Sequence, residues 1–403
     1  MNSNPDLVIV GAGPAGLALA AALADAGLRP LVLEQQDRAA LDEPAEDGRE
    51  IALTHRARRV MQTLGIWQAL PESGVAPLRE ARVLDGDAPT TLHFGPGDEA
   101  LGWLVPNHLI RRAALAAALQ RPAVQLLCNA RVTALSRDAE SATVTLADGN
   151  RYTAALIVAA DSRFSQTRRL AGIGAQMHDF GRSVVVGRVA HTLPNHGIAW
   201  ECFRYGNTLA LLPLNDDVTS AVVTVDSSLA AQWLALDDEA FAARIEAQVA
   251  GRLGSLRAAG PRHHYPLVGV YAHRFAAPRF ALVGDAAVGM HPVTAHGYNF
   301  GLYGVEVLAR ELGRAHGRGL DLGALPALQA YEREHRRTTL PVYLGTNAIV
   351  SLFTDERALP KLARQAVIQL SERMPLVSQL VKMAITRQLT GTGRTRRATA
   401  VPG

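Results

Sequence analysis

An acidic residue in a glycine-rich loop is the strongest chemical feature of the sequence, within Arg279–Leu302 (RFALVGDAAVGMHPVTAHGYNFGL). The apolar run Phe280–Val283 predicts a buried strand, and Asp285 follows the glycine at its end. A loop marked by glycine and proline comes next, and we expect a helix from about Tyr298. A carboxylate accepts hydrogen bonds from sugar-like hydroxyls, and the amino end of a helix stabilises negative charge. A reduced flavin has a ribityl chain and an anionic ring edge, so the loop predicts a flavin site.

A second glycine pattern lies at the other end of the chain. The apolar run Leu7–Val10 predicts a strand, GAGPAG follows it, and an alanine-rich helix is expected over Leu17–Ala26. A second strand, Leu31–Glu34, closes with an acid. Strand, glycine turn, helix, strand and acid together form the complete dinucleotide-binding fingerprint.

Each residue of this fingerprint has a separate predicted task. Gly11 makes the tight turn, Gly13 lets the backbone approach a pyrophosphate, and Gly16 lets the helix pack on the strand. Glu34 is placed to accept hydrogen bonds from an adenosine ribose.

Arginines in two further segments could neutralise a pyrophosphate. Arg49 precedes a predicted helix that ends at Gly65 and lies in a loop, whereas Arg56 lies on the helix and suits a solvated face. Arg111 and Arg112 lie in the first turns of a helix expected from about Asn107, with a surface charge as the alternative.

The composition favours an α/β enzyme and argues against several other classes. The 403 residues are 48% hydrophobic, which suits two or three domains. The net charge is +4, and because the last thirteen residues hold three arginines and no acid, the rest is near +1. No basic run is interleaved with aromatic residues, so we expect no nucleic-acid partner. We expect no metal site from the two cysteines, no signal peptide and no membrane-spanning helix, and hence a cytoplasmic protein.

The remaining periodicity predicts one more parallel-sheet segment and a separate antiparallel sheet. Four runs follow the first helix region, of which the first and last complete the parallel sheet and the middle two suit a small antiparallel crossover: Val124–Leu127, Ala130–Ser136, Ala142–Leu146 and Tyr152–Ala159. Four alternating runs then predict an antiparallel sheet that forms one wall of a pocket: Ser183–Val189, Ala199–Tyr205, Thr208–Pro213 and Thr219–Val225. One helix, Asp237–Leu253, interrupts the second set.

These elements predict four regions. The expected boundaries are a discontinuous FAD-binding domain over 1–75, 101–180 and 272–325, a β-sheet substrate domain over 76–100 and 181–271, a C-terminal helical segment over 326–390, and a disordered tail over 391–403. Within the helical segment, Leu376–Leu389 has an apolar stripe, which would either pack on the body or contact a membrane surface or partner.

Three motifs resemble one known family: GAGPAG with Glu34, AADSRFSQTRR over Ala159–Arg169, and GDAAVGMHPVTAHGYNFGL over Gly284–Leu302. From about Asp6 to Gly391 the chain resembles the FAD-dependent aromatic hydroxylases built like p-hydroxybenzoate hydroxylase, and among these the ubiquinone-biosynthesis hydroxylases. Three segments resemble the sequences of the branch that hydroxylates demethoxyubiquinol-type intermediates: DGREIALTH, MHDFGR and HHYPLVG.

The resemblance implies an α/β fold, with a Rossmann-like FAD-binding domain, an inserted antiparallel-sheet substrate domain and a helical C-terminal segment. It implies hydroxylation of a prenylated phenol or quinol with O2 through a flavin C4a-hydroperoxide. NAD(P)H is one candidate electron donor and an external source is the other. It also suggests contact with other ubiquinone-biosynthesis proteins and a peripheral position on the inner face of the cytoplasmic membrane.

The resemblance and the fingerprint together give the expected site. The cofactor contacts are Gly11, Gly13, Ala15, Gly16, Glu34, Arg49, Arg111, Val132, Asp161, Gly284, Asp285, Pro292, Gly297, Tyr298 and Asn299. The flavin performs most of the chemistry, and a base that sharpens the phenol would assist it. The candidates for this base are His296, Tyr298, His291 and Tyr205, and for each of them a hydrogen-bonded structural role is the favoured alternative.

The chain departs from the family pattern at three positions. Asp161 is followed by Ser162 where the family usually has glycine, His296 stands for a common glutamine, and Gly304 replaces an acid on the following helix. These changes are compatible with FAD binding. They leave both NAD(P)H and an external source open as the electron donor.

Three other functions fit parts of the sequence. A hydroxylase of a small soluble phenol and a non-catalytic flavin-binding subunit would both keep the flavin motifs. An NAD-dependent dehydrogenase is disfavoured, because it does not require the second loop more than 250 residues after the first.

Overall fold

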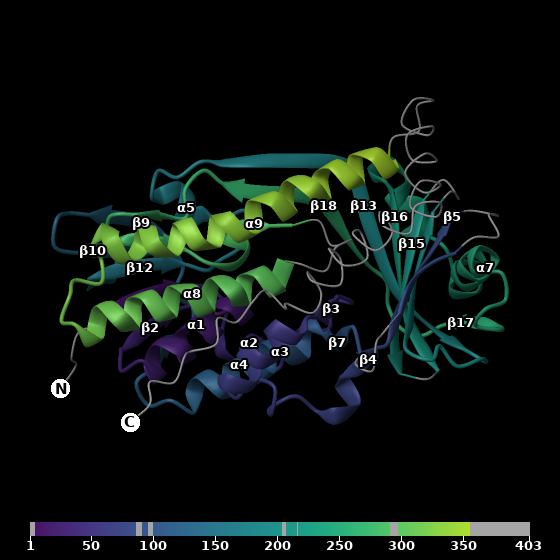
Figure 1. The fold of residues 1–403 in the computed structure, drawn as a ribbon, viewed down its shortest axis with the longest axis horizontal. Helices are drawn as coiled ribbons and strands as arrows, with labels where there is room; N and C mark the ends of the chain where they lie inside the picture. Colours follow the sequence, from purple (N-terminus) through teal and green to yellow (C-terminus); the bar gives the residue numbers. More distant parts are fainter. Residues whose placement is uncertain are drawn as a thin grey trace, which may run out of the picture.

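The computed structural model describes residues 5–85, 91–95, 100–203, 207–215, 217–290 and 297–354. Figure 1 shows helices and a parallel sheet at one end of the molecule and an antiparallel sheet at the other, with the long strands β13 and β18 running from one end toward the other.

A mainly parallel six-stranded sheet carries the first glycine pattern. Its order is β19 (Ala276–Ala277), β20 (Phe280–Leu282), β12 (Leu156–Ala159), β1 (Leu7–Val10), β2 (Pro30–Leu33) and β8 (Gln125–Leu127). The strands β1, β12 and β20 are parallel and in register, since Val10 pairs with Ala159 and Ala159 with Leu282. Their carboxyl ends therefore lie at one edge of the sheet, where Gly11, Asp161 and Asp285 follow within three residues.

The predicted strands of this sheet are confirmed, with one change. The run expected as a single strand, Tyr152–Ala159, is two strands: β11 (Arg151–Ala154) and β12. The strand β11 joins β9 (Val132–Arg137) and β10 (Ala142–Leu146) in a three-stranded antiparallel sheet. The small crossover sheet is thus confirmed, and the chain changes sheets at Ala155.

Four long helices cover this end of the molecule: α1 (Pro14–Asp25), α4 (Asn107–Leu119), α8 (Gly297–Gly317) and α9 (Leu325–Thr354). The shorter helices here are α2 (Arg38–Asp42), α3 (His55–Thr63) and α5 (Gln166–Leu170). A proline at the first position of α1 suits a helix start, where no backbone N–H is required. Among the helices that the structure describes, none combines the length and apolarity needed to cross a bilayer.

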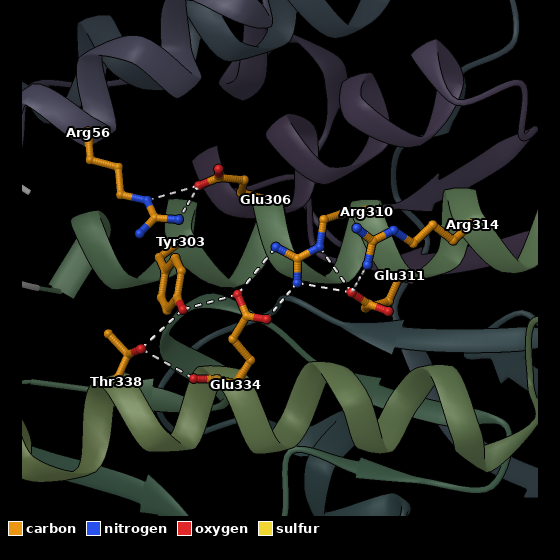
Figure 2. Close-up of polar contacts among 8 residues, drawn as sticks. All are labelled: Arg56, Tyr303, Glu306, Arg310, Glu311, Arg314, Glu334 and Thr338. Carbon is orange, nitrogen blue, oxygen red and sulfur yellow. Dashed lines mark hydrogen bonds and ion pairs between the residues drawn. The ribbon is translucent and has the colours of Figure 1, made fainter. Parts of the chain in front are cut away.

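Polar contacts hold α9 against α8, as Figure 2 shows. Arg310 of α8 contacts Glu334 of α9 at 2.6 Å, and the Tyr303 hydroxyl donates to the same carboxylate at 3.3 Å. The helix predicted beyond Leu325 is confirmed to Thr354. The expected amphipathic stretch 376–389 and the tail 391–403 lie outside the described residues.

The antiparallel sheet has the order β21 (Val288–Gly289), β18 (His263–Ala272), β13 (Ala175–His191), β16 (Val218–Asp226), β15 (Thr208–Asn215), β14 (Ile198–Phe203), β5 (Glu80–Asp85) and β6 (Thr91–Phe94), with β17 (Leu256–Ala258) beside β13. One face is buried under α6 (Ala230–Leu234) and α7 (Asp238–Val249). The predicted strands are present, and the domain boundaries remain a prediction. At the expected boundary near residue 180, β13 continues with a register shift between Asp179 and Ser183 in its pairing with β18.

A three-stranded sheet connects the two ends of the molecule, in the order β3 (Glu50–Leu53), β7 (Gly102–Pro106) and β4 (Ala76–Leu78). The strand β3 was not expected, since the sequence predicted a polar loop and a helix over this stretch. Its four residues contain only two aliphatic side chains that favour strands, and pairing with β7 supplies the rest of its stabilisation.

Candidate functional site: a dinucleotide cradle between two glycine loops

The first glycine loop has the backbone geometry that its sequence predicts. Gly11 has φ +109°, and a Cβ there would lie 2.7 Å from the carbonyl oxygen of Ala160. A Cβ at Gly16 would run into the Gly11 carbonyl, so this glycine allows the close approach of α1 to β1. Gly13 differs from both, because a Cβ there would meet nothing within 4 Å. The loop therefore has an open side at Gly13, beside the amino end of α1.

Glu34 lies directly beside this loop. Its Oε2 accepts a hydrogen bond from the Ala12 backbone N–H at 2.8 Å, and its Oε1 accepts one from Gln36 N–H at 2.9 Å. Each carboxylate oxygen has a further lone pair, so the group can still accept from a ribose. Arg111 donates to the Gln36 side chain at 3.2 Å, which places the predicted cation next to Glu34. Val132 is buried at the start of β9.

The second glycine loop meets the first. Gly284 has φ +64°, and a Cβ there would lie 2.9 Å from Cβ of Ala15 on α1. A Cβ on Gly301, in the first turns of α8, would lie 3.8 Å from the same atom. Two motifs that are far apart in the sequence thus form one continuous surface across Ala15.

Asp285 lies at the amino end of α8, as expected. The helix begins at Gly297, one residue before the predicted start, and a Cβ at Gly297 would lie 3.9 Å from Asp285 Oδ1. The carboxylate is partly exposed and its Oδ2 contacts Arg163 at 3.2 Å. A half-open carboxylate beside a helix amino end can hold a hydroxyl-rich chain and an anionic group together.

The motif AADSRFSQTRR joins the two loops through residues that the sequence did not single out. Arg168 is buried and donates to the Ala286 carbonyl at 2.9 Å, while Arg163 donates to Asp285. Asp161 accepts from Thr167 N–H at 3.2 Å through Oδ2, and its Oδ1 is buried with no partner among the described residues. The only sequence signal for the two arginines was their place inside this motif.

Arg49 lies on a loop that is hydrogen-bonded to elements at both ends of the molecule. It pairs with Asp47 at 2.5 Å, and Asn107 and Tyr265 also donate to Asp47. Burial lowers the pKa of Arg49, but its hydrogen bond to Asp47 and the nearby negative charges, Asp285 among them, outweigh burial and raise it. Arg49 is thus within the electrostatic field of Asp285. Arg56 instead pairs with Glu306 of α8 at 2.8 Å (Figure 2).

Two predicted residues have other contacts than expected. The Asn299 side chain accepts from Thr54 N–H at 2.9 Å and donates to the Ala52 carbonyl at 2.8 Å, so it ties α8 to β3. The Tyr298 hydroxyl is buried without a partner among the described residues, and burial raises its pKa. Burial thus favours the neutral phenol, and the role of Tyr298 as a base stays a prediction. His291, Pro292, His296 and Tyr205 lie outside the described residues.

Side-chain packing explains why glycine stands at position 304, where the family commonly has an acid. A Cβ there would lie 2.6 Å from the ring of His335 on α9. Burial lowers the pKa of His335 to about 4, so its ring is neutral and packs among Tyr303, Phe275 and Tyr331. The glycine therefore makes room for a histidine between α8 and α9.

The cradle fits an extended dinucleotide. Its features are the open side of Gly13, the carboxylates of Glu34 and Asp285, and the orphaned Asp161 Oδ1. A family model described as an FAD binding domain matches residues 5–338. The chain belongs to this FAD-binding family.

Relatives of nearly full length place it more narrowly. It is 46% identical to ubiquinone hydroxylase UbiM of Neisseria meningitidis over 97% of this chain and 86% of the relative. It is 39% identical to ubiquinone hydroxylase UbiL of Rhodospirillum rubrum, covering 93% of this chain and 88% of the relative. The 3-demethoxyubiquinol 3-hydroxylase of Escherichia coli is 26% identical over 95% of this chain and 99% of the relative. The predicted family, that of the FAD-dependent ubiquinone hydroxylases, is thereby confirmed.

Solved structures confirm the fold. The flavin monooxygenase PqsL of Pseudomonas aeruginosa superposes with a TM-score of 0.74 at 22% identity, covering 88% of this chain and 97% of that structure. The p-nitrophenol 4-monooxygenase PnpA of Pseudomonas putida gives 0.76 at 17% identity, covering 98% and 100%. The expected α/β fold, FAD as cofactor and the monooxygenase class are confirmed.

Proposed function

We propose that this enzyme hydroxylates the aromatic ring of a prenylated phenol or quinol intermediate of ubiquinone biosynthesis, at a demethoxyubiquinol-type stage. The observation that carries the proposal is that the two glycine loops meet at Ala15 and Gly284. Their meeting gives one extended FAD molecule a continuous binding surface. The printed names of the relatives support the substrate class.

In this proposal the residues divide the FAD between them. Glu34 would hold the adenosine ribose, and the open backbone at Gly13 would accommodate the pyrophosphate, with Arg111 as a counter-charge. Asp285 would accept hydrogen bonds from the ribityl hydroxyls, with its carboxylate held by Arg163. The amino end of α8 would stabilise negative charge on the ring.

The bound FAD supplies the activation of O2 for insertion into an electron-rich ring. The protein must then position the ring and exclude water. We propose NAD(P)H as a transient electron donor. Anaerobic addition of NADH to the yellow holoenzyme should bleach its flavin bands, and an unbleached spectrum would point to an external donor.

We further propose a cytoplasmic enzyme with a peripheral membrane contact and with other ubiquinone-biosynthesis proteins as neighbours. The apolar stripe of Leu376–Leu389 motivates this placement. Co-sedimentation with anionic vesicles should fall when residues 370–403 are removed, and unchanged sedimentation would contradict the membrane contact.

Complementation tests the reaction itself. Bacteria that lack a ubiquinone hydroxylase should regain ubiquinone when they express this chain, and mass spectrometry should show loss of one hydroxyl-deficient intermediate. Restoration of none of the blocked steps, together with turnover of small soluble phenols by the purified enzyme, would overturn the substrate class and leave the flavin monooxygenase assignment.

A further inference from the structure

The two faces of the antiparallel sheet differ in how completely they are covered. On one face, which we call the outer face, Leu209, Leu211 and Val223 are buried against Phe241 of α7. The residues that alternate with them, Ala210, Leu212 and Val222, point to the opposite face and are only partly buried. This inner face is therefore an apolar wall that is less completely covered than the outer face at Ala210, Leu212 and Val222.

The inner face is turned toward the flavin cradle. Arg188 of β13 lies on it, in register with Ser220, and reaches Glu50 of β3 at 3.0 Å. Glu50 directly follows Arg49, which lies in the field of Asp285. Tyr265, on the same face of β18, donates to the loop at Asp47.

A carboxyl group lies within this apolar wall. Cys202 of β14 is buried on the outer face, so its neighbour Glu201 projects from the inner face. Glu201 is in register with Ala210, Ala210 with Val222, and Val222 with Val186. The carboxyl group therefore stands in a row of small apolar side chains.

One oxygen of the Glu201 carboxyl group, Oε1, is buried without a hydrogen bond among the described residues. Burial raises the pKa of Glu201 to about 8, so the group is mostly neutral at pH 7. A buried carboxyl with an unmet hydrogen-bonding atom destabilises the fold, and a leucine of similar length would not.

We propose that Glu201 is the site that binds the ring hydroxyl of the substrate, with Oε1 accepting the phenolic O–H while the ring lies against Ala210 and Val222, the partly exposed side chains of this row. This inference rests on the proposed function, since it takes the substrate to be a phenol. It gives the buried oxygen a partner, which it does not have among the described residues. It also assigns a polar group that distinguishes a phenol from an apolar ring of the same shape.

A pair of ligands and a pair of variants test the assignment. We would titrate the oxidised FAD-loaded enzyme with 2-geranylphenol and with its methyl ether, 2-geranylanisole, by calorimetry. The variants are Glu201→Leu and Glu201→Gln. The matched control is Asp226→Asn, whose carboxylate lies at the end of β16 and caps the exposed turn at Ser228.

The wild type should bind the phenol about tenfold more tightly than the ether, which is the value of one hydrogen bond. Glu201→Leu should remove this preference and bind both ligands equally, while Glu201→Gln, which keeps an acceptor oxygen, should retain most of it. Glu201→Leu should also melt at the same temperature as the wild type or higher. Asp226→Asn should keep the full preference for the phenol.

Three results would overturn the assignment. If Glu201→Leu keeps the preference for the phenol, Glu201 does not bind the hydroxyl. If Glu201→Leu lowers the melting temperature as its only effect, Glu201 is a structural residue. If the wild type binds neither ligand, the proposed substrate class fails and the role of Glu201 fails with it.

Discussion

Gly13 offers a substitution that should separate FAD binding from folding. Its backbone is extended at φ −69° and ψ 172°, which alanine adopts freely, and its Cβ would meet no protein atom within 4 Å. The new methyl group would occupy only the space in front of α1. In our account this space belongs to the pyrophosphate, so Gly13→Ala should fold normally and bind FAD weakly.

The size of each effect follows from the geometry. Alanine is a poorer helix cap than glycine, at a cost of roughly 0.5–1 kcal/mol, but it restricts the unfolded chain by a similar amount, so the apoprotein stability should change by less than about 0.5 kcal/mol. A methyl group forced into a close contact costs roughly 1–3 kcal/mol. The Kd for FAD should therefore rise about 5- to 150-fold.

The assay is a titration of apoprotein with FAD, followed by quenching of flavin fluorescence, with urea unfolding of the apoprotein alongside. Gly345→Ala is the matched control. Gly345 is an exposed residue of α9, and a Cβ there also meets no atom within 4 Å. Gly16→Ala should unfold the domain outright, since its Cβ runs into the Gly11 carbonyl. Wild-type affinity in Gly13→Ala would refute the placement of the pyrophosphate.

Three further predictions concern other residues of the site. Asp285→Ala should purify colourless, and full flavin occupancy by absorbance would contradict the placement of the ribityl chain. Gly304→Ala should lower the melting temperature because its Cβ would lie 2.6 Å from the His335 ring, and adding His335→Ala should recover most of the loss. Burial raises the pKa of Glu50 to about 6 although Arg188 opposes it, so the stability from this group is present below about pH 4.5 and lost as pH rises through 6. Glu50→Gln should remove about 2 kcal/mol of this pH dependence in urea unfolding, and an unchanged slope would contradict it.

The parts of the site that local patterns encode could be predicted from the sequence. The chain turns after strands β1 and β20 at Gly11 and Gly284, and both glycines have a positive φ. The helix expected from about Tyr298 is α8, which the structure describes from Gly297. Glu34 was placed beside the first loop because an acid at the end of the second strand is part of the fingerprint.

Residues whose role depends on distant partners could not be predicted. Arg168 reaches Ala286 across more than a hundred residues, and no local pattern distinguishes it from Arg169 beside it. The reason for glycine at position 304 depends on a distant residue, because the His335 ring occupies the space that a Cβ would need. Glu201 stands in an alternating strand, and only the structure shows that its Oε1 is buried with no hydrogen-bond partner among the described residues.

The direction of the cofactor tests the account most directly. A crystal structure of the FAD complex should place the adenosine ribose within hydrogen-bond distance of the Glu34 carboxylate and the ribityl hydroxyls within that distance of Asp285. An FAD bound in the reverse direction, or outside the surface where Ala15 meets Gly284, would contradict it.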